Sequence, residues 1–331
     1  MSETLGQFTW PKIGQERVIS FLEKSILAQK ITHTYIFAGP KDLGKNSLAL
    51  AFAHNLWRQD VVKSDDDSFK ARLNSDLCVL SRLEDKQQIS VDQAREFVRQ
   101  LSLASFFNSY KIGIIKEADR LSLEAQNALL KTLEEPRSQV IIILLTESPD
   151  KLLATILSRS QLLYFYPVSQ EAVYDYLLDQ APGKRSQAQE IAALAEGRPL
   201  RALKWLQEPE QYQAVLELQS SALDFILSDL AKRLAWIKDN IGDSPEREKI
   251  ILYLQVWENL WRDVLLFSFN QIDRLRYPAL KEQWHELQTK NPHLNLSKTA
   301  LAALQVLQAS RQQLQGAINP KNILENLAIY F

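Results

Sequence analysis

The residues that most directly suggest chemistry form one short stretch, Gly39-Pro40-Lys41-Asp42-Leu43-Gly44-Lys45-Asn46. Its spacing nearly matches G-x-x-x-x-G-K-[S/T], a loop whose backbone N–H groups cradle phosphates. An apolar run precedes it and an amphipathic stretch follows it, so it lies between a predicted strand and a predicted helix. We therefore expect Gly39, Gly44, Lys45 and Asn46 to form a phosphate-binding loop, with a simple strand-to-helix turn as the alternative.

Two positions depart from what ATP hydrolysis requires. Asn46 replaces the Ser or Thr whose hydroxyl would bind Mg²⁺. After the strand predicted at 112–115, Lys116 stands where a metal-holding Asp is expected, followed by Glu117. An ammonium about 4 Å from a divalent ion would cost several kcal/mol. Asp119 cannot take over by a register shift, because Lys116 and Glu117 would then enter the buried strand. The sequence predicts a site that does not hydrolyse ATP.

The bulk composition is that of a globular protein with several domains: 331 residues, 46% hydrophobic and 24% charged. Because the formal net charge is -1, no global field attracts nucleic acid. The single cysteine, Cys78, excludes an internal disulfide and a zinc site built on cysteine pairs, and we expect it in a strand as a small apolar residue. No secretion signal is visible, and the longest apolar run, 140–145, is too short to span a bilayer. We expect a soluble cytoplasmic protein.

The first half of the chain alternates apolar runs with amphipathic helical patterns. The predicted strands are 33–38, 76–81, 110–115, 140–146 and 162–166. The predicted helices are 45–57, 90–103 with Ser90 as N-cap, and 122–134, stopped by Pro136. The polar segment 60–75 is expected to be an exposed loop. Near-continuous apolar strands that alternate with helices imply a mostly parallel sheet covered on both faces.

The strand pattern disappears after residue 166. Short helices are predicted at 170–180, 186–196 and 199–206, and the chain stays helical from about 208, with tryptophans as core anchors at Trp236, Trp257, Trp261 and Trp284. Three domains are therefore expected: an α/β nucleotide-binding-type domain at 1–166, a small helical domain at 167–207 and a helical domain at 208–331.

Four stretches resemble the clamp-loader AAA+ family of bacterial tau/gamma and delta-prime subunits, and more distantly eukaryotic replication factor C. They are 33–40, 90–112, 118–136 and 151–160. The most specific contains Ala125-Gln126-Asn127-Ala128-Leu129-Leu130-Lys131-Thr132-Leu133-Glu134-Glu135-Pro136. The resemblance covers most of 1–207 and becomes weaker in the C-terminal helices. It implies an AAA+ P-loop-type parallel sheet with helices on both faces, then a small helical lid and an all-α C-terminal collar for oligomerisation.

The resemblance also implies roles for single residues. Arg159, followed by Ser160 where the family has Cys, matches an arginine finger that reaches the ATP of a neighbouring subunit. A surface arginine bonded to a helix end is the alternative. Thr146 matches the first sensor of the terminal phosphate, although a strand-ending β-branched residue explains it equally well. Arg201 resembles the second sensor, with Arg198 near enough to leave the assignment open and a solvated helix arginine as the alternative.

Many family members insert a four-cysteine zinc module after the phosphate-loop helix. This chain has only Cys78 and carries Asn74-Ser75-Asp76 where the family often has His-Pro-Asp. No zinc is therefore expected. No cofactor is expected to be required, and residual ATP or ADP binding without hydrolysis stays open.

The expected function is that of a delta-prime-type clamp-loader subunit of DNA polymerase III. It would assist ATP-dependent loading of the sliding clamp onto primed DNA during replication, with Arg159 acting in trans while its own site is degenerate. The implied partners are tau/gamma subunits, the delta subunit, the sliding clamp and, through the complex, primer-template DNA, with no membrane. The chain would be part of a DNA-directed DNA polymerase holoenzyme without being a catalyst by itself.

Two other functions are alternatives. A tau/gamma-type motor that hydrolyses ATP is favoured by Lys45 and Glu117 and opposed by Asn46 and Lys116. A stand-alone nucleotide-dependent DNA enzyme, such as a helicase, is disfavoured because basic patches with interleaved aromatic residues are absent from the sequence.

Overall fold

The computed structural model describes residues 8–59, 75–105, 109–135, 139–241, 247–290, 293, 295–314 and 319–331. The chain divides into two compact units, Met1–Leu203 and Lys204–Phe331. The domain boundary expected after residue 166 falls inside the first unit and stays a prediction. Most of the predicted loop at 60–75 (residues 60–74) and the predicted helix stop Pro136 lie outside the described residues.

The first unit is built around a parallel sheet, whose strand order within the described residues is β2-β3-β4-β1-β5. The strands are β1 (Thr34–Ala38), β2 (Leu77–Leu80), β3 (Lys111–Ile115), β4 (Val140–Thr146) and β5 (Gln161–Tyr164). Their bounds confirm the predicted strands to within two residues. Every residue of β1, β3 and β4 is buried, as near-continuous apolar runs predict for strands covered on both faces.

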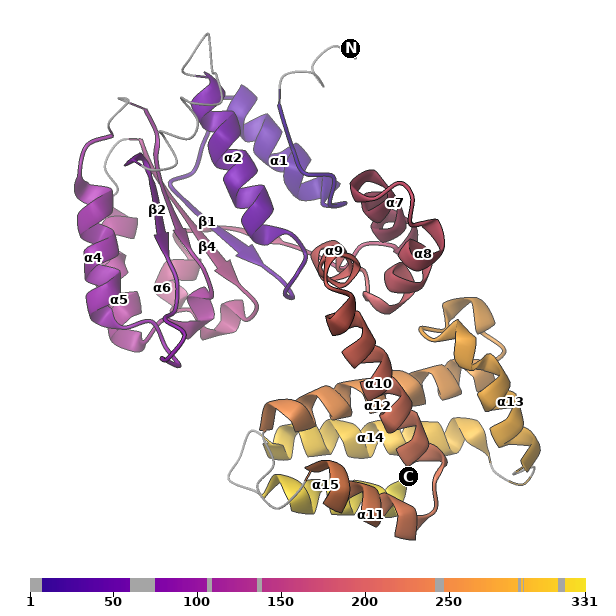
Figure 1. Ribbon diagram of the computed structural model, residues 1–331. Coiled ribbons are helices and arrows are strands. Elements are labelled where there is room, and N and C mark those ends of the chain that lie inside the picture. Colours follow the sequence, from indigo (N-terminus) through magenta and orange to yellow (C-terminus); the bar gives the residue numbers. More distant parts are fainter. Residues whose placement is uncertain are drawn as a thin grey trace. The chain divides into compact units, whose positions relative to one another are not determined.

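Helices cover both faces of this sheet (Figure 1). One core contains Tyr35 and Phe37 of β1 together with residues of α1 (Glu16–Leu27) and α2 (Lys45–Gln59). The other core contains Ile36 of β1 together with residues of α4 (Val91–Ser102), α5 (Leu123–Glu134) and α6 (Ala154–Leu157). Successive strand residues thus enter opposite cores, which is the period-2 alternation of a β-strand. The expected α/β class is confirmed.

Side-chain caps set where two of these helices begin. The Ser90 side chain accepts a hydrogen bond from the Gln93 backbone N–H, and the Gln93 side chain accepts one from the Ser90 backbone N–H. Ser122 accepts a hydrogen bond from the Ala125 backbone N–H at 3.1 Å. Each cap satisfies N–H groups that a helix start leaves without partners, and the first confirms the predicted N-cap.

The remaining helices of the first unit follow β5. They are α7 (Gln170–Gln180), α8 (Arg185–Leu194) and α9 (Pro199–Gln207), which crosses the boundary between the units. Gly197, with φ of +69°, makes the turn before α9, and a Cβ there would lie 2.3 Å from the Val168 carbonyl oxygen. Three-residue 3₁₀ turns occur at η1 (Ala118–Arg120) and η2 (Pro149–Lys151).

The second unit is helical. Its helices are α10 (Pro209–Leu227), α11 (Leu230–Ile241), α12 (Arg247–Ser268), α13 (Lys281–Lys290), α14 (Leu296–Leu314) and α15 (Pro320–Tyr330), with 3₁₀ turns η3 (Ile272–Arg274) and η4 (Pro278–Leu280). Trp257 and Trp284 are fully buried, Trp261 is 3% exposed and Trp236 is half-buried, so the predicted core anchors are confirmed. The Trp257 ring centroid lies 4.6 Å from that of Phe225. None of the helices described in either unit is long and apolar enough to cross a membrane.

Candidate functional site

The phosphate loop, residues 39–46, connects β1 to α2 and has the backbone that its glycines predict. Gly39 has φ of +145° and Gly44 has φ of +85°. A Cβ on Gly39 would lie 2.3 Å from the carbonyl oxygen of Phe165, so only glycine fits there. Ala38 pairs with Thr146, so the loop starts beside the end of β4. The predicted strand–loop–helix context is confirmed.

Lys45 is the first residue of α2, and its side chain turns back to the phosphate loop. Its Nζ donates hydrogen bonds to the carbonyl oxygens of Gly39 and Pro40, the second at 2.6 Å. Burial lowers the pKa of Lys45, while the charges of Glu147, Asp42 and Asp119 act in the opposite direction. The ammonium therefore already has acceptors in the protein.

A pocket beside Lys45 brings most of the predicted site residues together. It is lined by Lys41, Asp42, Gly44, Lys45, Asn46, Lys116, Glu117, Asp119, Leu145, Thr146, Glu147 and Leu200. Asn46 and Lys116 both face this pocket, so the two departures from the hydrolytic pattern lie at one site. A divalent ion here would meet an ammonium where a carboxylate is needed.

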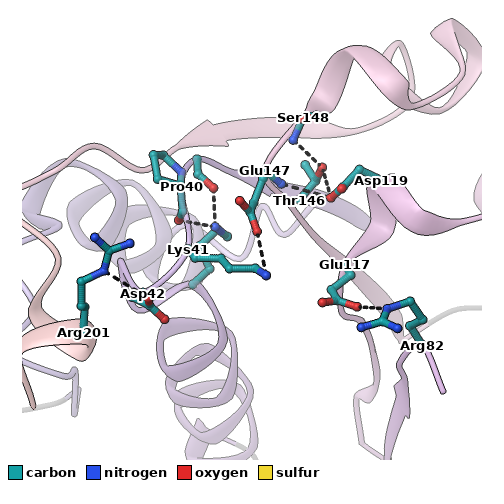
Figure 2. A network of polar contacts seen from close by, with 12 residues as sticks. Pro40, Lys41, Asp42, Arg82, Glu117, Asp119, Thr146, Glu147, Ser148 and Arg201 are labelled. Atoms are coloured by element: carbon teal, nitrogen blue, oxygen red, sulfur yellow. Dashed lines mark hydrogen bonds and ion pairs between the residues drawn. The ribbon is translucent and has the colours of Figure 1, made fainter. Parts of the chain in front are cut away.

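Glu117 follows the end of β3 in a left-handed conformation, with φ of +50°. The Nε of Arg82 donates a hydrogen bond to Oε2 of Glu117 at 3.0 Å (Figure 2). A carboxylate that would orient an attacking water must expose an acceptor to that water. In this structure the Arg82 guanidinium engages one oxygen, Oε2, of this carboxylate.

Thr146 and Asp119 are connected at the rim of the pocket. The Thr146 hydroxyl, buried at the end of β4, donates to Asp119 Oδ1 at 3.0 Å and accepts from the Ser148 backbone N–H at 3.1 Å. Asp119 also accepts from the Glu147 backbone N–H at 3.2 Å. β3 ends at Ile115, so Lys116 and Glu117 lie outside the strand, and the predicted strand register is confirmed. Asp119 nevertheless lines the pocket, because it lies in the η1 turn that follows.

Arg201 joins the start of α9 to the phosphate loop. Its Nε lies 3.7 Å from Asp42 Oδ2, and its Nη1 lies 3.7 Å from Glu196 Oε2, which also pairs with Arg198 at 3.3 Å. The Leu200 backbone N–H donates to the Asp42 carbonyl oxygen at 3.1 Å. Burial lowers the pKa of Arg201, and the neighbouring Arg198 charge lowers it further.

Arg159 lies apart from this pocket, just after α6. It borders a hollow lined by Thr32, His33, Thr34, Leu133, Glu134, Glu135 and Arg159. Its Nη2 lies 3.0 Å from Glu134 Oε1, and its Nη1 donates to the Thr155 carbonyl oxygen at 3.1 Å. Thr34 begins β1 and Gly39 directly follows its end, so Arg159 and the phosphate loop lie at opposite ends of one strand.

The remaining sequence predictions concern metals. Cys78 is buried in β2 and burial raises its pKa, as expected for a small apolar residue. Most of the segment where the family carries its zinc module, 60–74, lies outside the described residues. Among the residues that are described, no group of three or more His, Cys, Asp or Glu side chains could hold a metal ion.

Sequence reasoning did not assign Asp42 and Glu147, which line the pocket, or Arg82, which contacts Glu117. Asp42 carried a signal, because it lies inside the recognised motif. Glu147, 3.8 Å from Lys41, and Arg82 reach the site through contacts between elements far apart in the sequence.

The chain is similar in sequence to known replication proteins. A family model described as "DNA polymerase III, delta subunit" matches residues 14–169. DNA polymerase III subunit delta' of Bacillus subtilis is 26% identical over 97% of this chain and 98% of its own length. Subunit delta' of Haemophilus influenzae is 35% identical over 53% of this chain and 55% of its length. The similarity to DNA polymerase III delta' subunits thus extends over almost the whole chain.

DNA polymerase III subunits of the tau and gamma types are similar as well. Subunit tau of Bacillus subtilis is 26% identical over 95% of this chain, which spans 59% of that relative's length. A solved gamma subunit-related protein of Thermotoga maritima has a TM-score of 0.39 at 17% identity, covering 93% of this chain and 98% of that one. The fold class of this chain follows from its own parallel sheet and phosphate loop.

Proposed function

We propose that this chain is a delta-prime-type subunit of the DNA polymerase III clamp loader, working in the cytoplasm as part of a hetero-oligomer. It assists ATP-dependent loading of the sliding clamp onto primed DNA. Its partners are tau/gamma subunits, the delta subunit and the clamp, and it contacts primer-template DNA as part of the complex. The observation that carries the proposal is similarity along almost the whole length of a delta' subunit, together with a pocket altered at both metal-binding positions.

Arg159 is proposed to act on the ATP of a neighbouring subunit. It lies at the opposite end of β1 from the phosphate loop. Five strand residues at about 3.3 Å each separate the two by roughly 16 Å. An arginine so placed serves a site in the next subunit when subunits assemble head-to-tail, because such contacts join different faces of two molecules. Its planar guanidinium suits charge that spreads over transferred phosphate oxygens.

The pocket of the chain itself is proposed to be hydrolytically silent. Asn46 offers no hydroxyl to Mg²⁺, Lys116 opposes a divalent ion, and Glu117 is engaged by Arg82. The chemistry that the family performs at this pocket would then occur only in other subunits. Nucleotide binding without hydrolysis is compatible with these residues.

The test is reconstitution. The purified chain is combined with the tau/gamma and delta subunits of the same organism, and clamp loading on primed DNA is measured together with ATP turnover. We expect no turnover by the chain alone and no efficient loading when it is omitted. Loading that proceeds equally well without the chain would contradict the proposal.

A tau/gamma-type motor is the second candidate, because Lys45 and Glu117 are both present and subunit tau is similar over most of this chain. Steady-state ATP turnover by the isolated chain separates the two candidates. Mg²⁺-dependent turnover that is abolished by Glu117→Gln would favour the motor.

A further inference from the structure

The residue that the clamp-loader function leaves unexplained is Asp42, in the middle of the phosphate loop. It adopts a left-handed backbone with φ of +64°, a conformation that suits glycine and that Asp tolerates better than most residues. A carboxylate is also the least suitable group for a loop that would surround phosphate anions. Its presence therefore calls for a role other than phosphate binding.

The contacts of Asp42 point to the start of α9. Its carboxylate lies 3.7 Å from the Nε of Arg201 (Figure 2). Its carbonyl oxygen accepts a hydrogen bond from the Leu200 backbone N–H. Only 22% of the Arg201 side chain is exposed, and 45% of that of Asp42. A guanidinium that is largely removed from water requires an anion nearby.

The neighbouring charges reinforce this arrangement. Glu196, 13% exposed, holds Arg201 and Arg198 from the other side. Lys41, next to Asp42, pairs with Glu147 at the end of β4 at 3.8 Å. Backbone and side chains of two successive loop residues thus connect the phosphate loop to α9 and to β4.

From these contacts we propose that the Asp42 carboxylate is a built-in anion for Arg201, which holds the start of α9 on the phosphate loop without a nucleotide. In this arrangement a carboxylate of the chain takes the place of a bound phosphate. A nucleotide must displace Asp42 from Arg201 before it engages that arginine. Its apparent affinity is therefore its intrinsic affinity multiplied by the fraction of molecules in which Arg201 is released. The inference concerns the free chain and stands whether or not Arg159 acts in trans.

The first test measures how firmly α9 is held. Amide hydrogen exchange of a peptide covering 196–203 is compared between the wild-type chain and Asp42→Asn. We expect exchange to become about two- to fivefold faster, the range of a partly exposed ion pair. Asp92→Asn is the matched control, since Asp92 pairs with Arg95 at 3.5 Å on the exposed face of α4. In a chain that already carries Arg201→Gln, adding Asp42→Asn is expected to give no further increase, because the partner of Asp42 is then missing.

The second test measures competition with nucleotide. Binding of fluorescently labelled ADP without Mg²⁺ is compared between the wild-type chain and Asp42→Gly, which keeps the left-handed backbone and removes the anion. We expect at least about fivefold tighter binding by the variant. Unchanged exchange in Asp42→Asn, or ADP binding by the wild-type chain as tight as by Asp42→Gly, would overturn the proposal. Clamp loading is not read in either test, so failure of the proposed function would appear separately.

Discussion

The two ends of the parallel sheet differ in how their charged residues are held. At the carboxyl end, Lys45 contacts carbonyl oxygens of its own loop, Glu117 contacts Arg82, and Thr146 contacts Asp119. At the amino end, Arg159 borders an open hollow, pairs with Glu134 and remains 39% exposed.

Under the proposed function, the recognisable motif and the residue that contributes to ATP hydrolysis lie at different ends of the sheet. At the end with the phosphate-binding pattern, Lys45, Glu117 and Thr146 are engaged by other groups of the protein. The end without such a pattern presents a guanidinium that can exchange a solvent-exposed partner for another at little cost. Four variants test this contrast.

The largest effect is expected from Arg159→Ala in the assembled clamp loader. Arginine fingers contribute roughly 10³–10⁵ to phosphoryl transfer at the site they reach. Because other subunits keep their own fingers, we expect ATP turnover and clamp loading by the complex to fall by about tenfold or more. Arg159→Lys is expected not to restore them, since an ammonium lacks the planar fork. Arg95→Ala, exposed on α4, is the control, and equal activity of the two alanine variants would contradict the assignment.

Gly39→Ala tests whether the phosphate loop, at the carboxyl end of the sheet, contributes to the stability of the fold. The added Cβ would lie 2.3 Å from the Phe165 carbonyl oxygen, at a φ of +145°. We expect a loss of about 2–3 kcal/mol in the free energy of unfolding, measured by urea denaturation. Gly183→Ala serves as control because a Cβ added there would meet nothing within 4 Å among the described residues, its chain neighbours aside. A Gly39→Ala chain as stable as that control would mean that the loop is mobile enough to give way.

The double substitution Asn46→Thr with Lys116→Asp restores the two expected metal contacts. ADP affinity is measured by calorimetry with Mg²⁺ and with a chelator. For the wild-type chain the two affinities should be similar, whereas the double variant should gain about tenfold from Mg²⁺. If ADP binding by the wild-type chain already depends on Mg²⁺, the pocket at the carboxyl end of the sheet still holds a metal ion, and the proposed contrast with the amino end is wrong.

The smallest effect is expected from Glu134→Gln at the amino end. The side chains of Glu134 and Arg159 are 46% and 39% exposed, so their ion pair is screened by water. The free energy of unfolding should change by less than about 1 kcal/mol, and less still at high salt. A loss above about 2 kcal/mol would show that Arg159 is fixed in the free chain.

Much of the first unit could be predicted because its strands are buried on both faces and therefore appear as continuous apolar runs. Helix α4 was equally clear, since Ser90 and Gln93 form a capping box. Helix α1 was missed, although Val18, Leu22 and Ile26 recur at helical spacing and are buried. It lies before the first predicted strand, and no recognisable motif adjoins it.

Half of the residues that line the pocket were named from the sequence, but their contacts with one another were not. Spacing placed Lys45, Lys116 and Thr146 at the carboxyl ends of strands or the start of a helix, and parallel strands bring such positions together. Partners such as Arg82 for Glu117, or Asp42 for Arg201, come from elements separated by many residues. Contacts between side chains of different strands do not recur at a fixed spacing in the sequence, so no local pattern predicts them.

The aromatic core of the second unit has a spectroscopic consequence. Of the seven tryptophans, Trp10 and Trp57 belong to the first unit and the other five to the second. The rings of Trp236 and Trp257 lie 5.9 Å apart, and Tyr253 stacks 5.6 Å from Trp257. Aromatic rings this close and rigidly packed couple their electronic transitions. Near-ultraviolet circular dichroism should therefore follow mainly the melting of the helical unit, with a smaller contribution from Tyr35 and Trp57, which are buried in the sheet unit.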